Sequence, residues 1–163
     1  MKYAESLDDV LDGLSPSNML IIGPVGQSLV GAYLSEHPQC QATIIEPDNI
    51  MAKLDGLGRY DLVFVSHVLE ALPFDKGVQL VARLRDIHAK RLILSVLTEG
   101  ENSAAGWRKT DFLSLGLVQL AENTSNNKKI HVFGYDVLNY KTNPDWLNSR
   151  YWAHPELYDK HWW

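Results

Sequence analysis

The segment NMLIIGPVGQSLVGAYL, at residues 18–34, constrains the fold of this chain more than any other. A short apolar run ends at Gly23, and a turn then leads into a pattern with apolar residues on one helix face. A second β-branched run follows at residues 42–45 and is closed by Glu46. This succession of strand, glycine turn, helix, strand and carboxylate is typical of a βαβ unit that binds a nucleotide. In such a unit helix amides face an anionic or polar ligand, and the carboxylate binds a ribose hydroxyl.

The composition indicates one ordinary globular domain. Of the 163 residues, 45% are hydrophobic and 21% are charged, and no apolar run approaches the ~20 residues of a membrane helix. The net charge of −5 argues against non-specific binding to nucleic acid or to anionic lipid. Four acidic residues among the first twelve exclude a signal peptide. The single cysteine, Cys40, has no partner for an internal disulfide, so we expect an inert thiol in a reducing cytoplasm.

Hydrophobic periodicity predicts strands that alternate with helices. The expected strands are 19–22, 42–46, 62–66, 91–97, 117–121 and 130–135, and the expected helices are 3–14, 27–36, 75–88 and 104–115, with a short helix or turn near 68–72. In the third of these helices we expect Asp75 as the cap, with Val78, Val81, Leu84 and Ile87 facing the core.

The last two predicted strands are joined directly, so they form a β-hairpin and one of them runs antiparallel to the other strands. The fold class is therefore α/β, a three-layer αβα Rossmann-like domain with a mainly parallel six-stranded sheet that ends in an antiparallel hairpin. Numbering the strands in chain order, we expect the sheet order 2-1-3-4-6-5, with strand 1 central and no long strand in 47–60.

Four motifs support this interpretation: IIGPVG, IIEPDN, YDLVFVSHVLEAL and DFLSLGL. Together they resemble the class I S-adenosylmethionine (SAM) methyltransferases, over residues 1–138. The resemblance implies that SAM is the cofactor. It places around SAM the glycine loop, the ribose carboxylate and the end of the third strand, namely Gly23, Pro24, Gly26, Glu46 and Ser66.

The resemblance also places His67 beside the methyl group and the substrate, where it is the candidate for catalysis. The alternative is an ordinary turn histidine. Asp61 begins the same strand at the opposite edge, so we interpret it as structural. Loop residues after the fourth strand lie at the correct edge to contact substrate, although polar residues are also the ordinary content of a loop: Thr98, Glu99 and Asn102.

Three features depart from the family pattern. Ile21 stands where the family usually has an acidic residue, and Val25 stands where it usually has its second glycine. Only 15 positions separate Glu46 from Asp61, where the family normally has a helix, a third strand and another helix. That third strand lies at the sheet edge, so its loss leaves the core whole but removes a wall from the adenine side.

The segment 139–163 is expected to form an aromatic tail distinct from the domain at 1–138. Seven of its 25 residues are aromatic, and it carries four of the five tryptophans. Such a tail would pack either on the domain itself or on a second subunit, and the second arrangement would give a homodimer. It has no basic stripe for stacking single-stranded nucleic acid. Four of its side chains lack a recognised metal-binding spacing, so no metal site is predicted: His154, Glu156, Asp159 and His161.

Two functions of different classes follow from these observations. The first, which the family resemblance favours, is a small SAM-dependent methyltransferase-like protein that acts on a small-molecule or protein substrate. The second is a non-catalytic methyltransferase-like domain that binds a ligand or a protein partner. The missing third strand and the missing acidic residue favour the second.

The aromatic tail generates the first prediction. Truncation after Thr142 should cause aggregation or a large fall in melting temperature, because burying even three of the lost rings contributes several kcal/mol. Differential scanning calorimetry of the truncated and full chains measures the effect. A truncated protein that stays soluble and melts within about 2 °C of the parent, less than a loss of 1 kcal/mol produces, would show that the tail is a peripheral arm.

Overall fold

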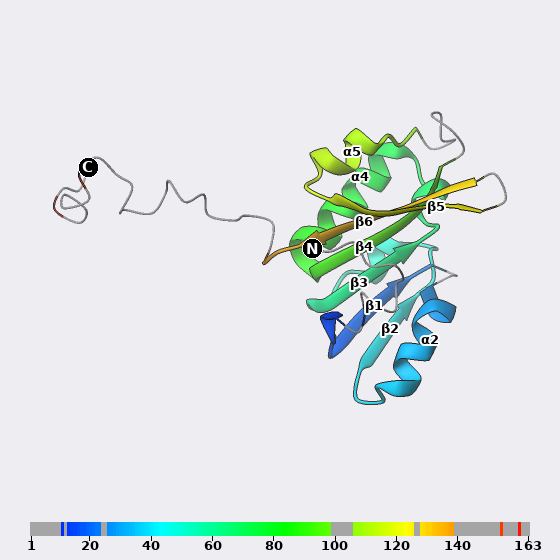
Figure 1. Ribbon diagram of the computed structural model, residues 1–163, viewed down its shortest axis with the longest axis vertical. Helices are drawn as coiled ribbons and strands as arrows, with labels where there is room; N and C mark the ends of the chain where they lie inside the picture. Colours follow the sequence, from blue (N-terminus) through cyan, green and yellow to red (C-terminus); the bar gives the residue numbers. More distant parts are fainter. Residues whose placement is uncertain are drawn as a thin grey trace.

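One mixed β-sheet organises the computed structural model, which describes residue 11, residues 13–23, 26–98, 106–125 and 128–138, and residues 154 and 160. Six strands pair in the order β2-β1-β3-β4-β6-β5 (Figure 1). Their bounds are β1 Asn18–Ile22, β2 Gln41–Ile45, β3 Tyr60–Ser66, β4 Ala89–Thr98, β5 Val118–Ser125 and β6 Lys128–Asp136. The first four strands are parallel, and β6 is antiparallel to both β4 and β5. The predicted strand order and the antiparallel hairpin are confirmed.

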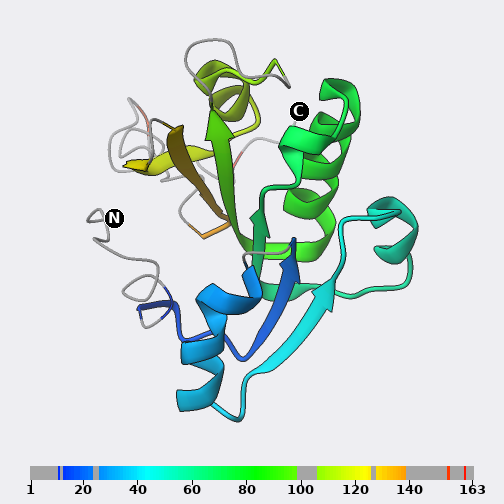
Figure 2. The ribbon, with the colours of Figure 1, turned by 90° about the vertical axis from the view of Figure 1, so that its right-hand side faces the viewer.

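The helices lie on the two faces of this sheet. They are α2 (Gly26–Glu36), α3 (Ile50–Lys53), α4 (Phe74–Arg83) and α5 (Lys109–Ser114), with a short 3-10 helix, η1, at Leu69–Ala71 and a π-helix, η2, at Leu84–His88. Figure 2 shows α2 and α4 on opposite faces of the sheet. The arrangement is the predicted three-layer αβα sandwich.

The inner strands separate two hydrophobic clusters, one on each face. Leu20 and Ile22 belong to the cluster under α4 and η2, whereas Met19 and Ile21 belong to the cluster under α2. All four are fully buried, as expected for a central parallel strand that is covered on both sides. Leu11 is also fully buried in the cluster under α2, although most of the helix predicted at 3–14 lies outside the described residues.

The sheet ends at β2, because the segment between β2 and β3 is short. Residues 46–59 contain the single-turn helix α3 and no strand. Ile50 and Leu54 from this segment are buried in the cluster under α4, so the segment covers a face of the sheet. Ile44 of β2 is 47% exposed on the other face. The short connection therefore closes the core but leaves β2 as an edge strand, as predicted.

The predicted core face of the helix at 75–88 is wrong at its C-terminal end. Val81 and Leu84 are fully buried, but Ile87 is 56% exposed and His88 takes the inward position. The cause is the π-helical geometry of η2. A π-helix has more residues per turn than an α-helix, so the residues that follow α4 are rotated relative to its buried face. His88 Nδ1 lies 3.1 Å from the carbonyl oxygen of Gly58. The predicted cap is also wrong: the N-cap is Pro73, two residues before Asp75, and Asp75 lies in the first turn of α4.

Stacked aromatic rings hold α5 against the hairpin end of the sheet. Phe112, from the DFLSLGL motif, is buried between Trp107 and Phe133, with ring centroids 4.6 and 4.1 Å away. The backbone N–H of Arg108 donates to the Asp111 carboxylate at 2.7 Å and so closes the first turn of α5. This motif therefore positions the antiparallel hairpin.

Asp61 holds the amino edge of the sheet together. Its carboxylate accepts hydrogen bonds from the backbone N–H and the hydroxyl of Ser17, and from Lys90 Nζ at 2.7 Å. It thereby links the start of β3 to the residue before β1 and to the second residue of β4. Lys90 and Ser17 together hold the pKa of Asp61 well below its usual range. The interpretation of Asp61 as a structural residue agrees with these contacts.

We predict that Asp61→Asn lowers the free energy of unfolding at neutral pH by roughly 1.5–3 kcal/mol, toward the lower end because Lys90 is largely exposed. Since the native state depresses the pKa of this group, its stabilisation is complete above the unfolded-state pKa of about 3.9 and is lost as the pH falls below it. Urea unfolding of both proteins across pH 3–7 measures this. A difference between the two proteins that stays constant down to the most acid pH would contradict the assignment.

Candidate functional site

The carboxyl ends of the four parallel strands meet at one edge of the sheet. Ile22 pairs with Ile45 on one side and with Val65 on the other, and Ser66 pairs with Ser95. Parallel α/β sheets place ligands outside this edge, beside the point where the strand order reverses. That point lies between β1 and β3, so the turns after these two strands are central to the candidate site.

Gly23 fits this position because the backbone of β3 lies directly against it. Its φ is +102°, and a Cβ atom would lie 2.1 Å from the carbonyl oxygen of Ser66 and 3.1 Å from Val68 Cγ2. The Gly23 N–H also donates to the carbonyl oxygen of Ile45 at 3.4 Å. The predicted glycine loop is thus tied to both neighbouring strands. Pro24 lies outside the described residues, and Gly26 is the first residue of α2.

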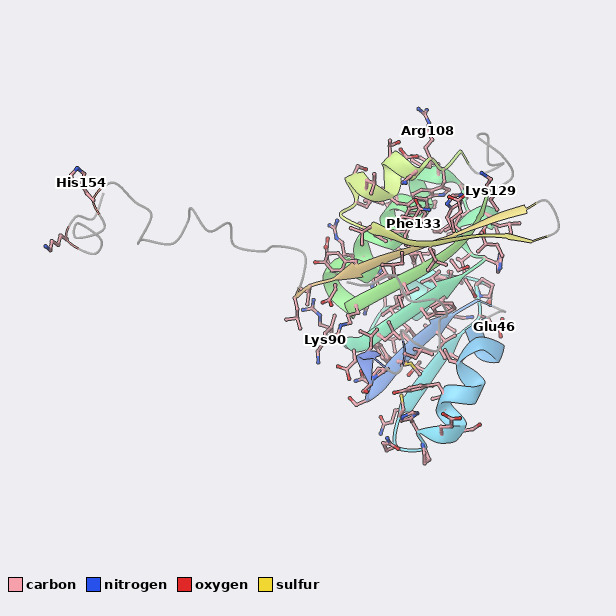
Figure 3. All side chains as sticks on the ribbon, in the orientation of Figure 1. Glu46, Lys90, Arg108, Lys129, Phe133 and His154 are labelled. Atoms are coloured by element: carbon pink, nitrogen blue, oxygen red, sulfur yellow. The ribbon has the colours of Figure 1, made fainter. Side chains whose placement is uncertain are left out.

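Glu46 follows β2 at the same edge of the sheet (Figure 3). The residue is exposed. The nearby ammonium of Lys53 pairs with Asp48 at 2.8 Å and reaches only the backbone oxygen of Glu46, at 3.5 Å. Within the described part of the chain, no hydrogen bond or ion pair engages the Glu46 carboxylate. The carboxylate is therefore accessible to a ligand at the position the sequence predicted.

Ser66 ends β3 and is completely buried. Its hydroxyl oxygen has no hydrogen-bond partner among the described residues. Buried hydroxyls in native proteins usually have a partner, so an unpartnered one at a sheet edge is a feature of ligand sites as well as of sites that hold water. Gly23 and Ser66 are adjacent through the contact described above, which brings two of the predicted cofactor residues together.

His67 follows Ser66 with a left-handed backbone, φ +51°. Its side chain is 30% exposed, and Nδ1 lies 3.5 Å from Oε1 of Glu70. The same Glu70 oxygen accepts a hydrogen bond from the backbone N–H of Leu97. The sequence analysis did not single out Glu70. The only signal for it was its position three residues after His67 in a predicted turn, a spacing that brings side chains together once a helical turn forms.

Other predicted residues contribute less to this edge. The side chain of Thr98, and Glu99 and Asn102 altogether, lie outside the description. Cys40 is buried before β2, and this burial, with a smaller effect of Asp61, raises the pKa of its thiol. A raised thiol pKa favours the unreactive protonated form, in agreement with the predicted inert cysteine.

Within the described residues there is no group of three or more His, Cys, Asp or Glu side chains suited to a metal ion. Nor does this part of the chain contain a helix long and apolar enough to cross a membrane. The aromatic tail lies outside the description except for His154 and Lys160, both exposed. Its predicted packing, and the division of the chain at residue 138, stay predictions.

The strand order and the antiparallel hairpin define the Rossmann-like fold of class I SAM-dependent methyltransferases. The chain itself belongs to the family described as "Family of unknown function (DUF6231)", whose model matches residues 1–163. No curated protein matches it in sequence.

Solved structures similar to this fold include several methyltransferases. The N-terminal domain of EvdMO1, determined in the presence of SAH and D-fucose, has 11% identity and a TM-score of 0.52, over 79% of this chain and 80% of that one. The bifunctional kinase-methyltransferase WbdD has 15% identity and a TM-score of 0.52, over 80% of this chain and 37% of that one. The mitomycin 7-O-methyltransferase MmcR has 16% identity and a TM-score of 0.50, over 74% and 49%. The likeness at these identities shows the fold alone, and this chain spans less than half of the last two proteins.

The Gly23 contact generates a stability prediction. Gly23→Ala should lower the free energy of unfolding by roughly 2–6 kcal/mol, because backbone strain at positive φ adds to steric overlap with a backbone carbonyl. Urea denaturation measures the loss. Two matched controls separate the causes, since a Cβ at Gly56 (φ +83°) or at Gly58 would meet no atom within 4 Å. Gly56→Ala should show the strain alone and Gly58→Ala little change. A Gly23→Ala protein no less stable than Gly56→Ala would show that the β1–β3 contact relaxes freely.

Proposed function

We propose that this protein binds SAM at the carboxyl edge of its sheet and transfers the methyl group to a small-molecule or protein substrate. The observation that carries this proposal is the convergence of the glycine turn at Gly23, the exposed carboxylate of Glu46 and the unpartnered hydroxyl of Ser66. The three groups lie at the ends of adjacent strands, in a fold that is shared with solved methyltransferases.

The residues present fit a nucleoside with an amino-acid side chain. Glu46 offers two acceptor oxygens at the end of β2, which suits the two hydroxyls of a ribose. Ser66 offers a hydroxyl that can donate and accept beside the glycine turn. A positively charged cofactor would also be compatible with the protein's net charge of −5.

The cofactor, when bound, supplies an activated methyl group on a sulfonium. The chain's own contribution is to bind and orient, because holding a nucleophile in line with the reacting carbon supplies a large part of the rate enhancement of such a transfer.

The single buried cysteine suits the reducing cytoplasm in which we propose that the protein acts. We also propose that the aromatic tail packs on this domain or on a second copy of the chain.

A second candidate is a non-catalytic module that binds a ligand or a protein partner, and two observations favour it. Ile21, at the position where the related enzymes usually carry an acidic residue, is fully buried in the core and offers no polar group. The segment 46–59 supplies only α3 near the adenine side. Isothermal titration with SAM and with S-adenosylhomocysteine (SAH), alongside mass spectrometry of co-purified nucleosides, separates the candidates. No detectable binding at millimolar concentration would favour the non-catalytic module.

We predict that Glu46→Ala weakens SAM and SAH binding by at least tenfold, because a hydrogen bond to a charged group contributes roughly 1.5–3 kcal/mol. Isothermal titration calorimetry measures the change. Glu36→Ala is the matched control, since Glu36 is also an exposed carboxylate and is the last residue of α2, away from the turn after β1. Unchanged affinity in the Glu46 variant would show that any nucleoside ligand does not use this carboxylate.

A further inference from the structure

The turn after β3 holds a histidine and a glutamate in fixed positions at the candidate site. The left-handed φ of His67 is uncommon outside glycine, although histidine and asparagine adopt it more readily than most residues. The His67 N–H donates to the carbonyl oxygen of Ser95 on β4 at 3.2 Å. Val68 and Leu69 are then buried, at 2% and 1% exposure. The backbone of His67 is therefore fixed between β4 and the hydrophobic core, while its ring stays partly exposed.

The carboxylate of Glu70 is fixed by β4 in the same way. Oε1 accepts a hydrogen bond from the backbone N–H of Leu97 and lies 3.5 Å from Nδ1 of His67. Oε2 is buried and has no hydrogen-bond partner among the described residues. Oε1, the oxygen that faces Nδ1 of His67, is a hydrogen-bond acceptor, so a hydrogen on that ring nitrogen is favoured.

This orientation determines which ring nitrogen of His67 can receive a proton. An acceptor beside Nδ1 favours the tautomer with hydrogen on Nδ1, which leaves the lone pair on Nε2. Hydrolases activate a nucleophile with the same arrangement: a carboxylate beside one ring nitrogen of a histidine sets the tautomer, and the other ring nitrogen accepts the proton. Here the pair stands directly after Ser66, at the edge where the cofactor would bind.

We propose that His67 accepts the proton of the substrate nucleophile and that Glu70 is the residue that orients it. This inference rests on the proposed function and specifies its substrate class as a protic nucleophile, such as a hydroxyl, a phenol or the N–H of a neutral amine. The nucleophile's lone pair forms the bond to the methyl carbon, the carbon–sulfur electron pair goes to sulfur, and the nucleophile's proton passes to Nε2 of His67. A nucleophile without a proton would not need this pair.

A purely structural role for Glu70 can be separated from an orienting one. In Glu70→Gln the amide oxygen can still accept the hydrogen bond from Leu97, so the tie between η1 and β4 is kept while the charge facing His67 is removed. His67→Asn keeps a residue that tolerates the left-handed backbone. Glu122→Gln is the matched control, because Glu122 lies 3.5 Å from Nδ1 of His131 on the hairpin, in a second His–Glu pair.

The test is ¹⁵N NMR of the full chain labelled on its histidine rings, at an alkaline pH where the imidazoles are neutral. His67→Asn identifies the signals of His67. We expect the Nδ1–H tautomer of His67 in the parent and its loss in Glu70→Gln, with no change at His67 in Glu122→Gln. An Nε2–H tautomer in the parent, or a tautomer that Glu70→Gln leaves unchanged, overturns the inference.

Titration with SAH provides the second measurement. The His67 ring signals should shift on addition of SAH to the parent, and calorimetry should show that both site variants bind SAH within about threefold of the parent. Binding that leaves the His67 signals unmoved overturns the inference but leaves the proposed function standing. A parent protein that binds neither SAM nor SAH overturns the proposed function, and with it the assignment of a substrate.

Discussion

The candidate site depends on the close approach between Gly23 and the carbonyl oxygen of Ser66. Because the space a Cβ would take at Gly23 is filled by the backbone of β3, the turns after β1 and β3 pack directly on each other. The same glycine donates to Ile45, so the end of β2 is held as well. These contacts bring the carboxylate after β2 and the hydroxyl and imidazole after β3 to a common edge. A side chain at residue 23 would separate the groups of the candidate site.

Two carboxylates at the amino edge of the sheet have partners within the protein, whereas two polar groups at the carboxyl edge do not. At the amino edge, Asp61 has Ser17 and Lys90 as partners, and Asp136 pairs with Arg91 at 3.1 Å. At the carboxyl edge, the Ser66 hydroxyl and one oxygen of Glu70 are buried with no partner in the described part of the chain. Polar groups that complete their bonds within the protein stabilise the fold, whereas buried ones left incomplete favour a ligand or a water. The unpartnered groups of Ser66 and Glu70 support the ligand site that we propose at the carboxyl edge, although His88 Nε2, directly before β4 at the amino edge, is also buried without a partner among the described residues.

The short connection after β2 changes the adenine side of the fold without disturbing its core. Ile50 and Leu54 pack under α4 in the space that a longer crossover would otherwise cover. The cost falls on β2, which becomes an edge strand with an exposed Ile44. Edge strands in natural proteins are commonly covered or carry charge, and β2 carries no charged residue. If the aromatic tail or a second copy of the chain covered β2, it would shield this edge strand from solvent. It would also replace the part of the adenine side that the short connection leaves open.

The sequence alone determined the strand order, the hairpin and the position of the carboxylate after β2, because near-continuous apolar runs and short connections allow few topologies. It did not determine the face of the last turn of the α4–η2 helix, where a π-helical turn exchanges Ile87 for His88. Nor did it identify Glu70, whose position depends on a hydrogen bond to Leu97 from a strand 27 residues away. Local periodicity reports which residues are apolar and how they repeat. Only the tertiary structure shows which polar atoms meet across strands and which are left without a partner, since those contacts join residues that are distant in sequence.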